Sequence, residues 1–403
     1  MRRVVITGAG TVNALAQDVA GTYAAFAEGR CGIAELDLRD KDRLSIQIGG
    51  QVKHWDAEAR FSRQQLTLYD RFTQFTLVAA AQAVAQAGLV FDGDLADDSG
   101  VVLGTAAGGV TTWDESYRAV YAEDKNRVHP FVVPKLMNSA AASHVAMRFG
   151  LRGASFSVST ACASSNHAMG LAFQAIRGGG ASVMLTGGSE SMLCFGGIKA
   201  WEGLRVMSQT ACRPFSANRS GMVQGEGAAV FVFEDYDHAR ARGAEILAEV
   251  AGFAMTSDAS DIVMPSQEGA ARTIRLALRD ARVAAEAVGY INAHGTGTAA
   301  NDKTECAAIA QVFGAAADAV MVSSTKSMHG HLIGGTGAVE LLACLMALQQ
   351  GVIAPTIGYE AADPECALDV VPNVARQAKV DVVMSNAFAF GGLNAVLVLR
   401  KVS

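Results

Sequence analysis

The stretch VSTACASSNHAMG, residues Val158 to Gly170, places one cysteine, Cys162, in a run of Ser, Thr, Ala and Gly at the expected start of a helix. A thiol at a helix N-terminus gains thiolate character from the helix dipole and the free N–H groups, which makes it a nucleophile toward acyl groups. A buried cysteine with no chemical role is a common alternative. The surrounding sequence decides between these two interpretations.

Strands and helices alternate along the chain on both sides of Cys162. Apolar residues recur at three- and four-residue spacing in FTQFTLVAAAQAVAQAGL, ARTIRLALRDARV and AVELLACLMALQQG, which predicts helices, the last ending at a Gly. The alternation indicates an α/β fold with mostly parallel sheets. Strands are predicted in short β-branched runs bounded by Gly, Asn or Ser: RRVVITG, SGVVLGT, ASVMLTGG, AAVFVFED, GYINAHG, AVMVSSTKS, VVMSNAF and NAVLVLR.

The pattern of strands and helices before FEDYDHARARGAE restarts after it. We therefore expect two related halves, residues 1–245 with Cys162 and residues 246–403 with further polar motifs. The opening TGAGTVN is interpreted as a Gly turn that ends a first buried strand. Asn13 stands there where a dinucleotide-binding fingerprint needs a third Gly.

Composition describes a large globular protein. A chain of 403 residues that is 50% hydrophobic and 18% charged can bury a large core. Its net charge of −6 offers no general attraction to nucleic acid or to an anionic membrane. No uninterrupted apolar run reaches the roughly 18 residues of a membrane-spanning helix, so no span is expected. The seven cysteines are scattered, odd in number and without a CxxC pair, which argues against disulfides or a zinc ribbon and favours the cytoplasm.

Three polar motifs follow predicted strands, where α/β proteins keep their sites. INAHGTGTAANDKTE carries His294, and SSTKSMHGHLIGGTGAVE carries Lys326, His329 and His331. SNAFAFGGLN adds Phe388 and Phe390 beside paired glycines. Each motif lies among Gly, Ser or Thr, as a site in a loop requires.

One cysteine and two histidines define a limited chemistry. Neutral imidazoles can donate an N–H to an oxyanion or enolate, or one can act as a base toward the thiol. The backbone N–H groups of Cys162 and Phe390 are candidates for an oxyanion hole around a thioester carbonyl. These residues favour acyl transfer through a thioester on Cys162.

Cys162 in STACASS, His294 in NAHGTGT and His331 in STKSMHGHLIGGTGAVE, in that order, resemble the Cys-His-His triad of the β-ketoacyl-[acyl carrier protein] synthases, most closely synthase II of fatty acid synthesis. The resemblance extends over the whole chain, from VVITGAG to SNAFAFGGLNAVLVL. It implies a thiolase-like fold of two similar halves, each layered αβαβα, in a homodimer. It also implies a partner, acyl carrier protein bearing acyl or malonyl phosphopantetheine, and neither a cofactor nor a metal.

The resemblance also implies a role for each matching residue. Cys162 is the acylated nucleophile, and His294 and His331 bind the malonyl thioester and stabilise its enolate. Lys326 resembles the family's active-site lysine. The other implied roles are Glu340 as the buried acidic partner of the lysine, Asp302 and Glu305 as supporting residues, Thr296 and Thr298 at the pantetheine arm, Trp201 at the substrate, and Phe390, with Phe388 beside it, as a gate that excludes malonyl until Cys162 is acylated.

Three departures from synthase II bear on the substrate. RFSRQQLTLYD, residues 60–70, lacks the family's frequent basic cluster, so carrier docking is expected to use Lys125, Arg127 and Arg205 instead. Val263 replaces a threonine that binds pantetheine, which removes a hydrogen bond worth roughly 1 kcal/mol. Ala107 replaces a branched residue at the pocket mouth, which predicts a larger acyl cavity.

Other kinds of site fit the sequence less well. A zinc site built on His329 and His331 finds only carboxylates and His294 as further ligands. A degradative thiolase relies on a second cysteine near its C-terminus, which SNAFAFGGLN lacks, and GGSES is not a GxSxG elbow. A non-catalytic chain-length partner typically lacks the nucleophile. Elongation of housekeeping fatty acids is the default expectation, and a specialised synthase of a nodulation-type, very-long-chain or polyketide-like pathway remains the alternative.

Overall fold

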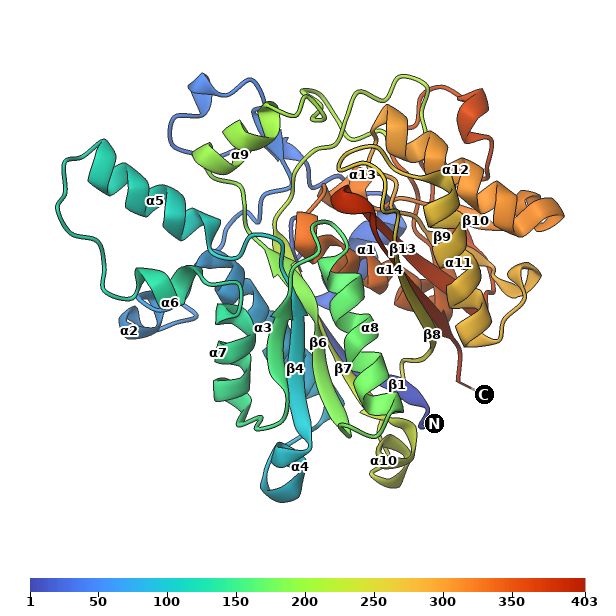
Figure 1. The fold of residues 1–403 in the computed structure, drawn as a ribbon, viewed down its shortest axis with the longest axis horizontal. Helices are drawn as coiled ribbons and strands as arrows, with labels where there is room; N and C mark the ends of the chain where they lie inside the picture. Colours follow the sequence, from blue (N-terminus) through green and yellow to red (C-terminus); the bar gives the residue numbers. More distant parts are fainter. Residues whose placement is uncertain (403) are drawn as a thin grey trace.

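A ten-stranded sheet runs through the molecule (Figure 1). The structure is a computed structural model and describes residues 1–402. The strands lie in the order β10-β9-β13-β14-β8-β1-β7-β6-β4-β5. Their bounds are β1 (Val4–Asn13), β4 (Ser99–Gly104), β5 (Ser155–Val158), β6 (Val183–Glu190), β7 (Gly227–Asp235), β8 (Ala248–Ser257), β9 (Tyr290–Asn292), β10 (Met321–Ser323), β13 (Val382–Ala389) and β14 (Leu393–Arg400).

The two sides of this sheet have the same topology. From the centre outward, one side reads β1-β7-β6-β4-β5 and the other reads β8-β14-β13-β9-β10, so the strands correspond one to one in chain order. In each half the two inner pairs are antiparallel and the two outer pairs are parallel. β1 pairs with β8 where the halves meet. The expected pair of similar halves is confirmed.

The prediction of mostly parallel sheets is wrong for the centre of the molecule. β7, β1, β8 and β14 run antiparallel to their neighbours. Only η6 (Phe390–Gly392), a 3-10 turn of three residues, connects β13 to β14. A parallel pair needs a crossover of about a dozen residues or more, so such a short connection forces an antiparallel pair.

Helices form three layers around the two halves of the sheet (Figure 1). α3 (Arg71–Ala87) and α7 (Ala140–Phe149) pack outside the first half. α11 (Gln267–Ala281) packs outside the second half and contacts α12 (Ala299–Phe313). α8 (Ser164–Arg177) and α14 (Thr336–Gln350) contact each other and strands of both halves, so they form the central layer. The layers therefore follow the order α-β-α-β-α of a thiolase-like fold.

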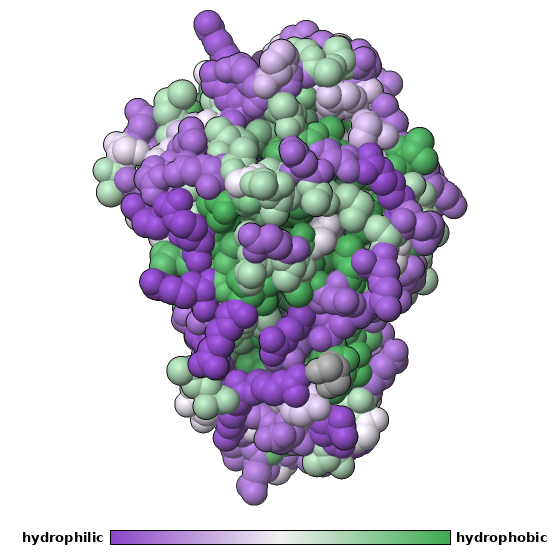
Figure 2. All heavy atoms as spheres, turned by 90° about the vertical axis from the view of Figure 1, so that its right-hand side faces the viewer, coloured by the Kyte–Doolittle hydropathy of each residue, from purple (hydrophilic) through white to green (hydrophobic). Residues whose placement is uncertain are grey.

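The face seen from the right-hand side of Figure 1 is mainly hydrophilic, with an apolar area near its centre (Figure 2). α11 lies at this side and exposes the charged residues Glu268, Arg272, Arg275 and Arg279. Its apolar residues Ile274 and Leu278 are buried in the core of the second half. This division is the amphipathic pattern that the sequence predicts for an outer helix.

Helix ends lie where the sequence signals place them. The side chain of Asp70 accepts a hydrogen bond from the N–H of Phe72 at the start of α3, and Gly88 ends the helix with a φ of 65°. Gly351 ends α14 with a φ of 66°. Glycine takes this left-handed conformation without the steric penalty of a Cβ, so it is a favoured stop.

The interpretation of TGAGTVN as a turn is wrong. β1 continues through these residues to Asn13, with an irregular register between Ile6 and Gly8. A Cβ at Gly8 would lie 2.1 Å from the carbonyl oxygen of Ala83 in α3, and one at Gly10 would lie 2.0 Å from that of Ala79. The glycines therefore allow a strand to pass close to a helix rather than to reverse direction.

Short elements complete the chain, and within residues 1–402 no helix has both the length and the apolar character to cross a membrane. The short elements lie in the connections between the main strands. They are α1 (Val19–Glu28), α2 (Arg63–Leu66), α4 (Gly93–Asp97), α5 (Val110–Tyr121), α6 (Val132–Leu136), α9 (Phe195–Glu202), α10 (Tyr236–Ala241), α13 (Lys326–His329), β2 (Ala34–Glu35), β3 (Ile48–Gly49), β11 (Val352–Ile353) and β12 (Arg376–Gln377).

Candidate active site

Cys162 lies in the turn between β5 and α8, two residues before Ser164, the first residue of the helix. The preceding residue, Ala161, has a φ of 48°, a left-handed conformation that non-glycine residues seldom adopt. Ser164 fixes this turn, because its Oγ accepts from the N–H of Thr160 at 2.9 Å and donates to the carbonyl of Ala161 at 2.7 Å. Strained backbone that the surroundings hold in place is typical of functional sites.

His294 follows β9, and Glu305 of α12 holds its loop. The two oxygens of the Glu305 carboxylate accept from the backbone N–H groups of His294 and Gly295, each at 2.8 Å. Asn386 of β13 donates to the same carboxylate at 3.2 Å. Glu305 thus supports His294 through the backbone and leaves its ring free to face the cavity.

Lys326 and Glu340 form a buried ion pair behind His294. The Lys326 ammonium donates to Glu340 Oε1 at 2.5 Å and to the carbonyl oxygen of His294. Both side chains are fully buried. Burial raises the pKa of Glu340 to about 7, against the opposing charge of Lys326. The pair ties α13 and α14 to the histidine loop.

His331 presents an N–H to the site. Its Nδ1 accepts a hydrogen bond from the backbone N–H of Ile333 at 3.1 Å and lies 2.7 Å from Thr336 Oγ1. A neutral imidazole whose Nδ1 accepts carries its proton on Nε2. His331 Nε2 is buried and has no hydrogen-bond partner within residues 1–402. A donor is therefore available to an incoming oxygen.

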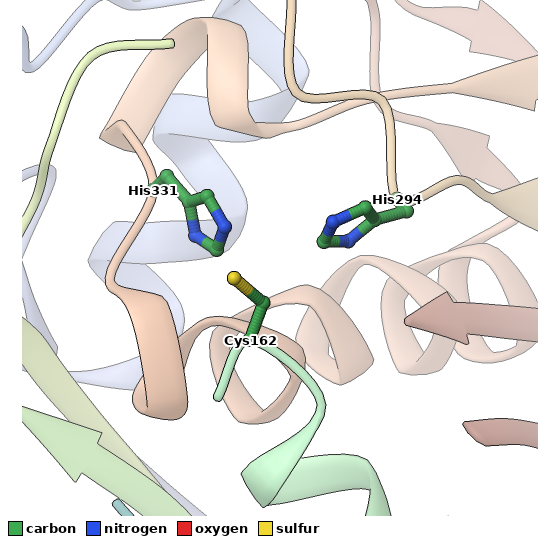
Figure 3. A group of neighbouring side chains, drawn as sticks. All are labelled: Cys162, His294 and His331. Atoms are coloured by element: carbon green, nitrogen blue, oxygen red, sulfur yellow. The ribbon is translucent and has the colours of Figure 1, made fainter. Parts of the chain in front are cut away.

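The thiol and the two imidazoles converge on one point (Figure 3). One ligand atom each from Cys162, His294 and His331 lie within 4.8 Å of one another. The two rings are nearly perpendicular, with centroids 5.6 Å apart. Burial, followed by the charge of Lys326, holds the pKa of both histidines well below their usual range. Both imidazoles are therefore neutral near pH 7.

Burial has the largest effect on the pKa of the Cys162 thiol. Burial raises its pKa to about 12, although Lys326 and the backbone N–H groups of Cys162 and Phe390 lower the pKa in part. The thiolate character expected from the helix N-terminus stays a prediction, and burial acts against it by raising the pKa of the thiol. The two N–H groups near the sulfur are those that the sequence suggested for an oxyanion hole.

A cavity of about 190 Å³ opens onto Cys162. Most of the residues suggested by the sequence line it, including both histidines, and Val263 lies on its wall. The wall also includes apolar residues that the sequence analysis missed, among them Val206, Met222 and Met264. The remaining suggested residues on the wall are Trp201, Thr296, Thr298, Glu305, Phe388 and Phe390.

Asp302 lies behind the cavity rather than in its wall. Its carboxylate accepts from the N–H of Phe215 at 2.8 Å and from the N–H of Gly297 at 3.2 Å. Arg219 lies 3.8 Å from it. Asp302 therefore supports the loop that carries Thr296 and Thr298.

Ala107 is not among the residues that line the cavity. Its N–H lies 3.3 Å from Glu190 Oε1 in the loop after β4. The same carboxylate accepts from the N–H of Ala106 at 2.7 Å and from that of Gly334 at 3.1 Å, so it joins this loop to the turn after His331. Sequence reasoning missed Glu190, although a carboxylate two residues after the apolar run ASVMLTGG was a signal.

The suggested docking residues lie in two places. Lys125 and Arg127 line a separate surface pocket, together with Lys135. Arg205 precedes Val206, a residue of the cavity wall. The structure thus places positive charge both beside the cavity wall and in the segment between α5 and α6.

A metal does not suit the Cys-His-His cluster. A histidine that binds a metal through Nε2 must keep its proton on Nδ1 and donate it to an acceptor. The Nδ1 of His331 instead faces the N–H of Ile333. His329 is not available either, because its ring nitrogens lie 2.7 Å from the Gly330 carbonyl and 3.0 Å from Thr325 Oγ1.

The fold and this thiol-imidazole site are those of condensing enzymes. Residues 1–239 match the N-terminal domain of the β-ketoacyl synthases, and residues 247–360 match their C-terminal domain. The chain belongs to the β-ketoacyl synthase family, and it is an acyl-transferring condensing enzyme.

Relatives of known sequence cover the chain from end to end. It is 48% identical to "Nodulation protein E" of Rhizobium leguminosarum bv. trifolii over 100% of both chains. It is 39% identical to "3-oxoacyl-[acyl-carrier-protein] synthase 2" of Staphylococcus aureus (strain N315), over 99% of this chain and 98% of that one.

Solved structures agree with this assignment. "The ishigamide ketosynthase/chain length factor" is 34% identical, with a TM-score of 0.95 over 100% of both chains. A β-ketoacyl synthase from Burkholderia phymatum STM815 is 33% identical, with a TM-score of 0.92 over the same coverage. A third match is a chain from the solved structure "type II PKS acyl-carrier protein in complex with its ketosynthase bound to the hexaketide". It is 31% identical, with a TM-score of 0.89 and 100% coverage of both chains.

Proposed function

We propose that the protein takes an acyl group from acyl carrier protein onto Cys162 and condenses it with malonyl-carrier. One observation carries this proposal. The buried thiol of Cys162 lies beside two neutral imidazoles and two backbone N–H groups, at the wall of an apolar cavity. A nucleophile with donors around it is the arrangement that acyl transfer requires. Each half-reaction then uses a different part of the site.

Cys162 acts in the first half-reaction. Its sulfur attacks the thioester carbonyl of acyl-carrier, and the N–H groups of Cys162 and Phe390 stabilise the oxyanion that forms. The carrier sulfur leaves and takes up the proton that the thiol gives up. The products are acyl-Cys162 and free carrier thiol, with no net change in protons.

His294 and His331 act in the second half-reaction. Their N–H groups bind the malonyl thioester oxygen while CO2 leaves, and they stabilise the enolate. The enolate carbon attacks the carbonyl of acyl-Cys162 and expels the Cys162 sulfur, which takes up a proton. The products are β-ketoacyl-carrier, CO2 and the free thiol.

A reconstituted condensation tests this function. Purified protein, acyl-carrier and malonyl-carrier are expected to give β-ketoacyl-carrier and one CO2 per product, both measured by mass spectrometry and labelled CO2 capture. Hydrolysis of acyl-carrier without any new carbon–carbon bond would contradict the proposal.

The segment around Lys125 and Arg127 is the proposed docking surface for the carrier. It forms a pocket of about 380 Å³ with Lys135 and His129 on its wall. Acidic carriers are steered by local positive charge of this kind. The solved complex of a related ketosynthase with its acyl-carrier protein supports a carrier as the partner.

Charge reversal at Arg127 tests the docking surface. Arg127→Glu is expected to raise the KM for carrier-bound substrate by up to about 5-fold, since one exposed charge contributes up to about 1 kcal/mol. The same acyl group on a small pantetheine thioester should keep its KM. Arg279→Glu, on the outer face of α11, is the matched control. An equal effect on both substrates would contradict a docking role.

A homodimer is proposed through β5. This strand is one of the two edge strands of the ten-stranded sheet, and its Phe156 is 42% exposed. α7 packs beside it and exposes Met147. An unpaired edge with apolar side chains is a template for pairing with a second copy.

Phe156→Glu is expected to convert the dimer to a monomer, because a charge would be buried at the new strand pair. Light scattering coupled to size exclusion measures the mass. Val90→Glu, at another exposed apolar residue, is the control that should remain dimeric. A wild-type monomer, or a dimeric Phe156→Glu variant, would contradict the β5 interface.

The sequence identities to known relatives favour a specialised synthase over a housekeeping synthase. The chain is 48% identical to a nodulation protein E but 39% identical to a synthase 2.

The seven free cysteines favour the cytoplasm, where thiols stay reduced. The matched regions 1–239 and 247–360 support a division of the chain near residue 245.

A further inference from the structure

Trp201 stacks on the gate residue of the cavity. It lies in the last turn of α9, is half-buried and lines the cavity that opens onto Cys162. Its ring centroid lies 6.0 Å from that of Phe390, with 23° between the ring planes. Aromatic pairs in such arrangements stabilise one another beyond the area that they bury.

The backbone after Phe390 is fixed by hydrogen bonds of the next two residues. Gly391 and Gly392, the next two residues, have φ values of 81° and 65°. The glycines are held by the segment opposite, because the N–H of Gly391 donates to the carbonyl of Ile262 at 2.8 Å and Gly392 accepts from the N–H of Asp258 at 2.9 Å. These bonds anchor the glycines, whereas the ring of Phe390 packs on Trp201.

Phe390 faces the thiol through its backbone. The backbone N–H of Phe390 is one of the two that face the Cys162 sulfur. The ring of Phe390 turns about χ1 without moving this N–H. The stack on Trp201 therefore bears on the position of the ring, whereas the backbone bonds of Gly391 and Gly392 hold the oxyanion donor in place.

We propose that Trp201 is a positioning residue that keeps the cavity closed. Its indole holds the ring of Phe390 beside the cavity, which excludes malonyl until an acyl chain displaces the ring. Trp201 touches neither the thiol nor an imidazole through a hydrogen bond and acts through Phe390 alone. The inference rests on the proposed function, since it explains why acyl-carrier reacts before malonyl-carrier.

Trp201→Leu keeps an apolar side chain in α9 and removes the stacked ring. Without an acyl primer, this variant should release more CO2 from malonyl-carrier. We expect the ratio of this unprimed release to primed condensation to rise about 10-fold, which is the upper end of the effect expected for loss of one aromatic pair. Trp201→Phe retains an aromatic ring and should restore the wild-type ratio. Labelled CO2 with and without primer, and β-ketoacyl product, are measured on the same samples.

A matched control and a double-mutant cycle separate gating from stability. Trp55 also packs on a phenylalanine, Phe75, but outside the cavity, so Trp55→Leu should leave the ratio unchanged. In a Phe390→Leu background, Trp201→Leu should add no further change, because its effect passes through the Phe390 ring. Thermal unfolding of each variant checks the fold.

The ratio of unprimed CO2 release to condensation decides the proposal. An unchanged ratio in Trp201→Leu, or equal ratios in Trp201→Leu and Trp201→Phe that both differ from wild type, would overturn the role of Trp201. A full further effect in the Phe390→Leu background would overturn it as well. A wild-type protein that forms no β-ketoacyl product would instead overturn the proposed function itself.

Discussion

Cys162→Ala is expected to lose acyl transfer and condensation completely. Only the sulfur can hold the acyl group in the proposed mechanism, and alanine leaves the neighbouring histidines in place. Release of CO2 from malonyl-carrier should continue at the rate of the wild-type protein without primer, because His294 and His331 carry that step. Gel-shift or mass analysis of acylation, beside labelled CO2, measures both activities.

A second buried cysteine provides the control for this experiment. Cys344 of α14 is fully buried and lies outside the cavity, with its Sγ 3.5 Å from the carbonyl of Met384. Cys344→Ala should retain acylation and condensation. A folded Cys162→Ala variant that loses CO2 release as well as acylation would contradict the division of labour between the thiol and the histidines.

His331→Ala is expected to slow CO2 release in the primed reaction by about 100-fold to 1000-fold. Its Nε2–H is the donor aimed at charge that develops during decarboxylation, and loss of such a donor has this order of effect. Acylation of Cys162 should survive, since the two backbone N–H groups at the sulfur remain. Stopped reactions with acyl-carrier alone, and then with malonyl-carrier, separate the two steps.

His331→Gln tests the donor rather than the ring. A glutamine amide carries an N–H near the position of Nε2, so it should recover part of the lost rate. The wild-type rate of CO2 release should also stay flat between about pH 6 and pH 8, because the pKa of both histidines lies well below its usual value of about 6.5. Loss of activity on histidine protonation within that range would contradict a neutral donor.

The sequence was sufficient to predict the architecture of two halves and to single out three residues that the structure brings together, Cys162, His294 and His331. Cys162 follows β5 and His331 lies in the loop region after β10, which are equivalent positions in the two halves, and His294 follows β9. The packing of the two halves, which brings these positions together, is not encoded in any one motif. Helices α3 and α14 were also predictable, since their apolar spacing and glycine stops are local features. Each of these signals is carried by residues that are close to one another in the sequence.

Other properties depend on neighbours that are distant in sequence. Motif reasoning assigned thiolate character to Cys162, but burial by several elements decides its pKa. The proton position on His331 depends on the N–H of Ile333. β1 passes through TGAG as a strand because α3 lies against it, which no local pattern encodes. The stack of Trp201 on Phe390 joins residues from the two halves.

Mass spectrometry of the acylated protein tests the central claim most directly. The wild-type protein is incubated with acyl-carrier alone, digested, and searched for the acyl mass on each of its seven cysteines. The account predicts one acyl group per chain, on the peptide that contains Cys162, which disappears when malonyl-carrier is added and β-ketoacyl-carrier forms. An unmodified Cys162, an acyl group on another residue, or an adduct that persists after malonyl-carrier is added would contradict it.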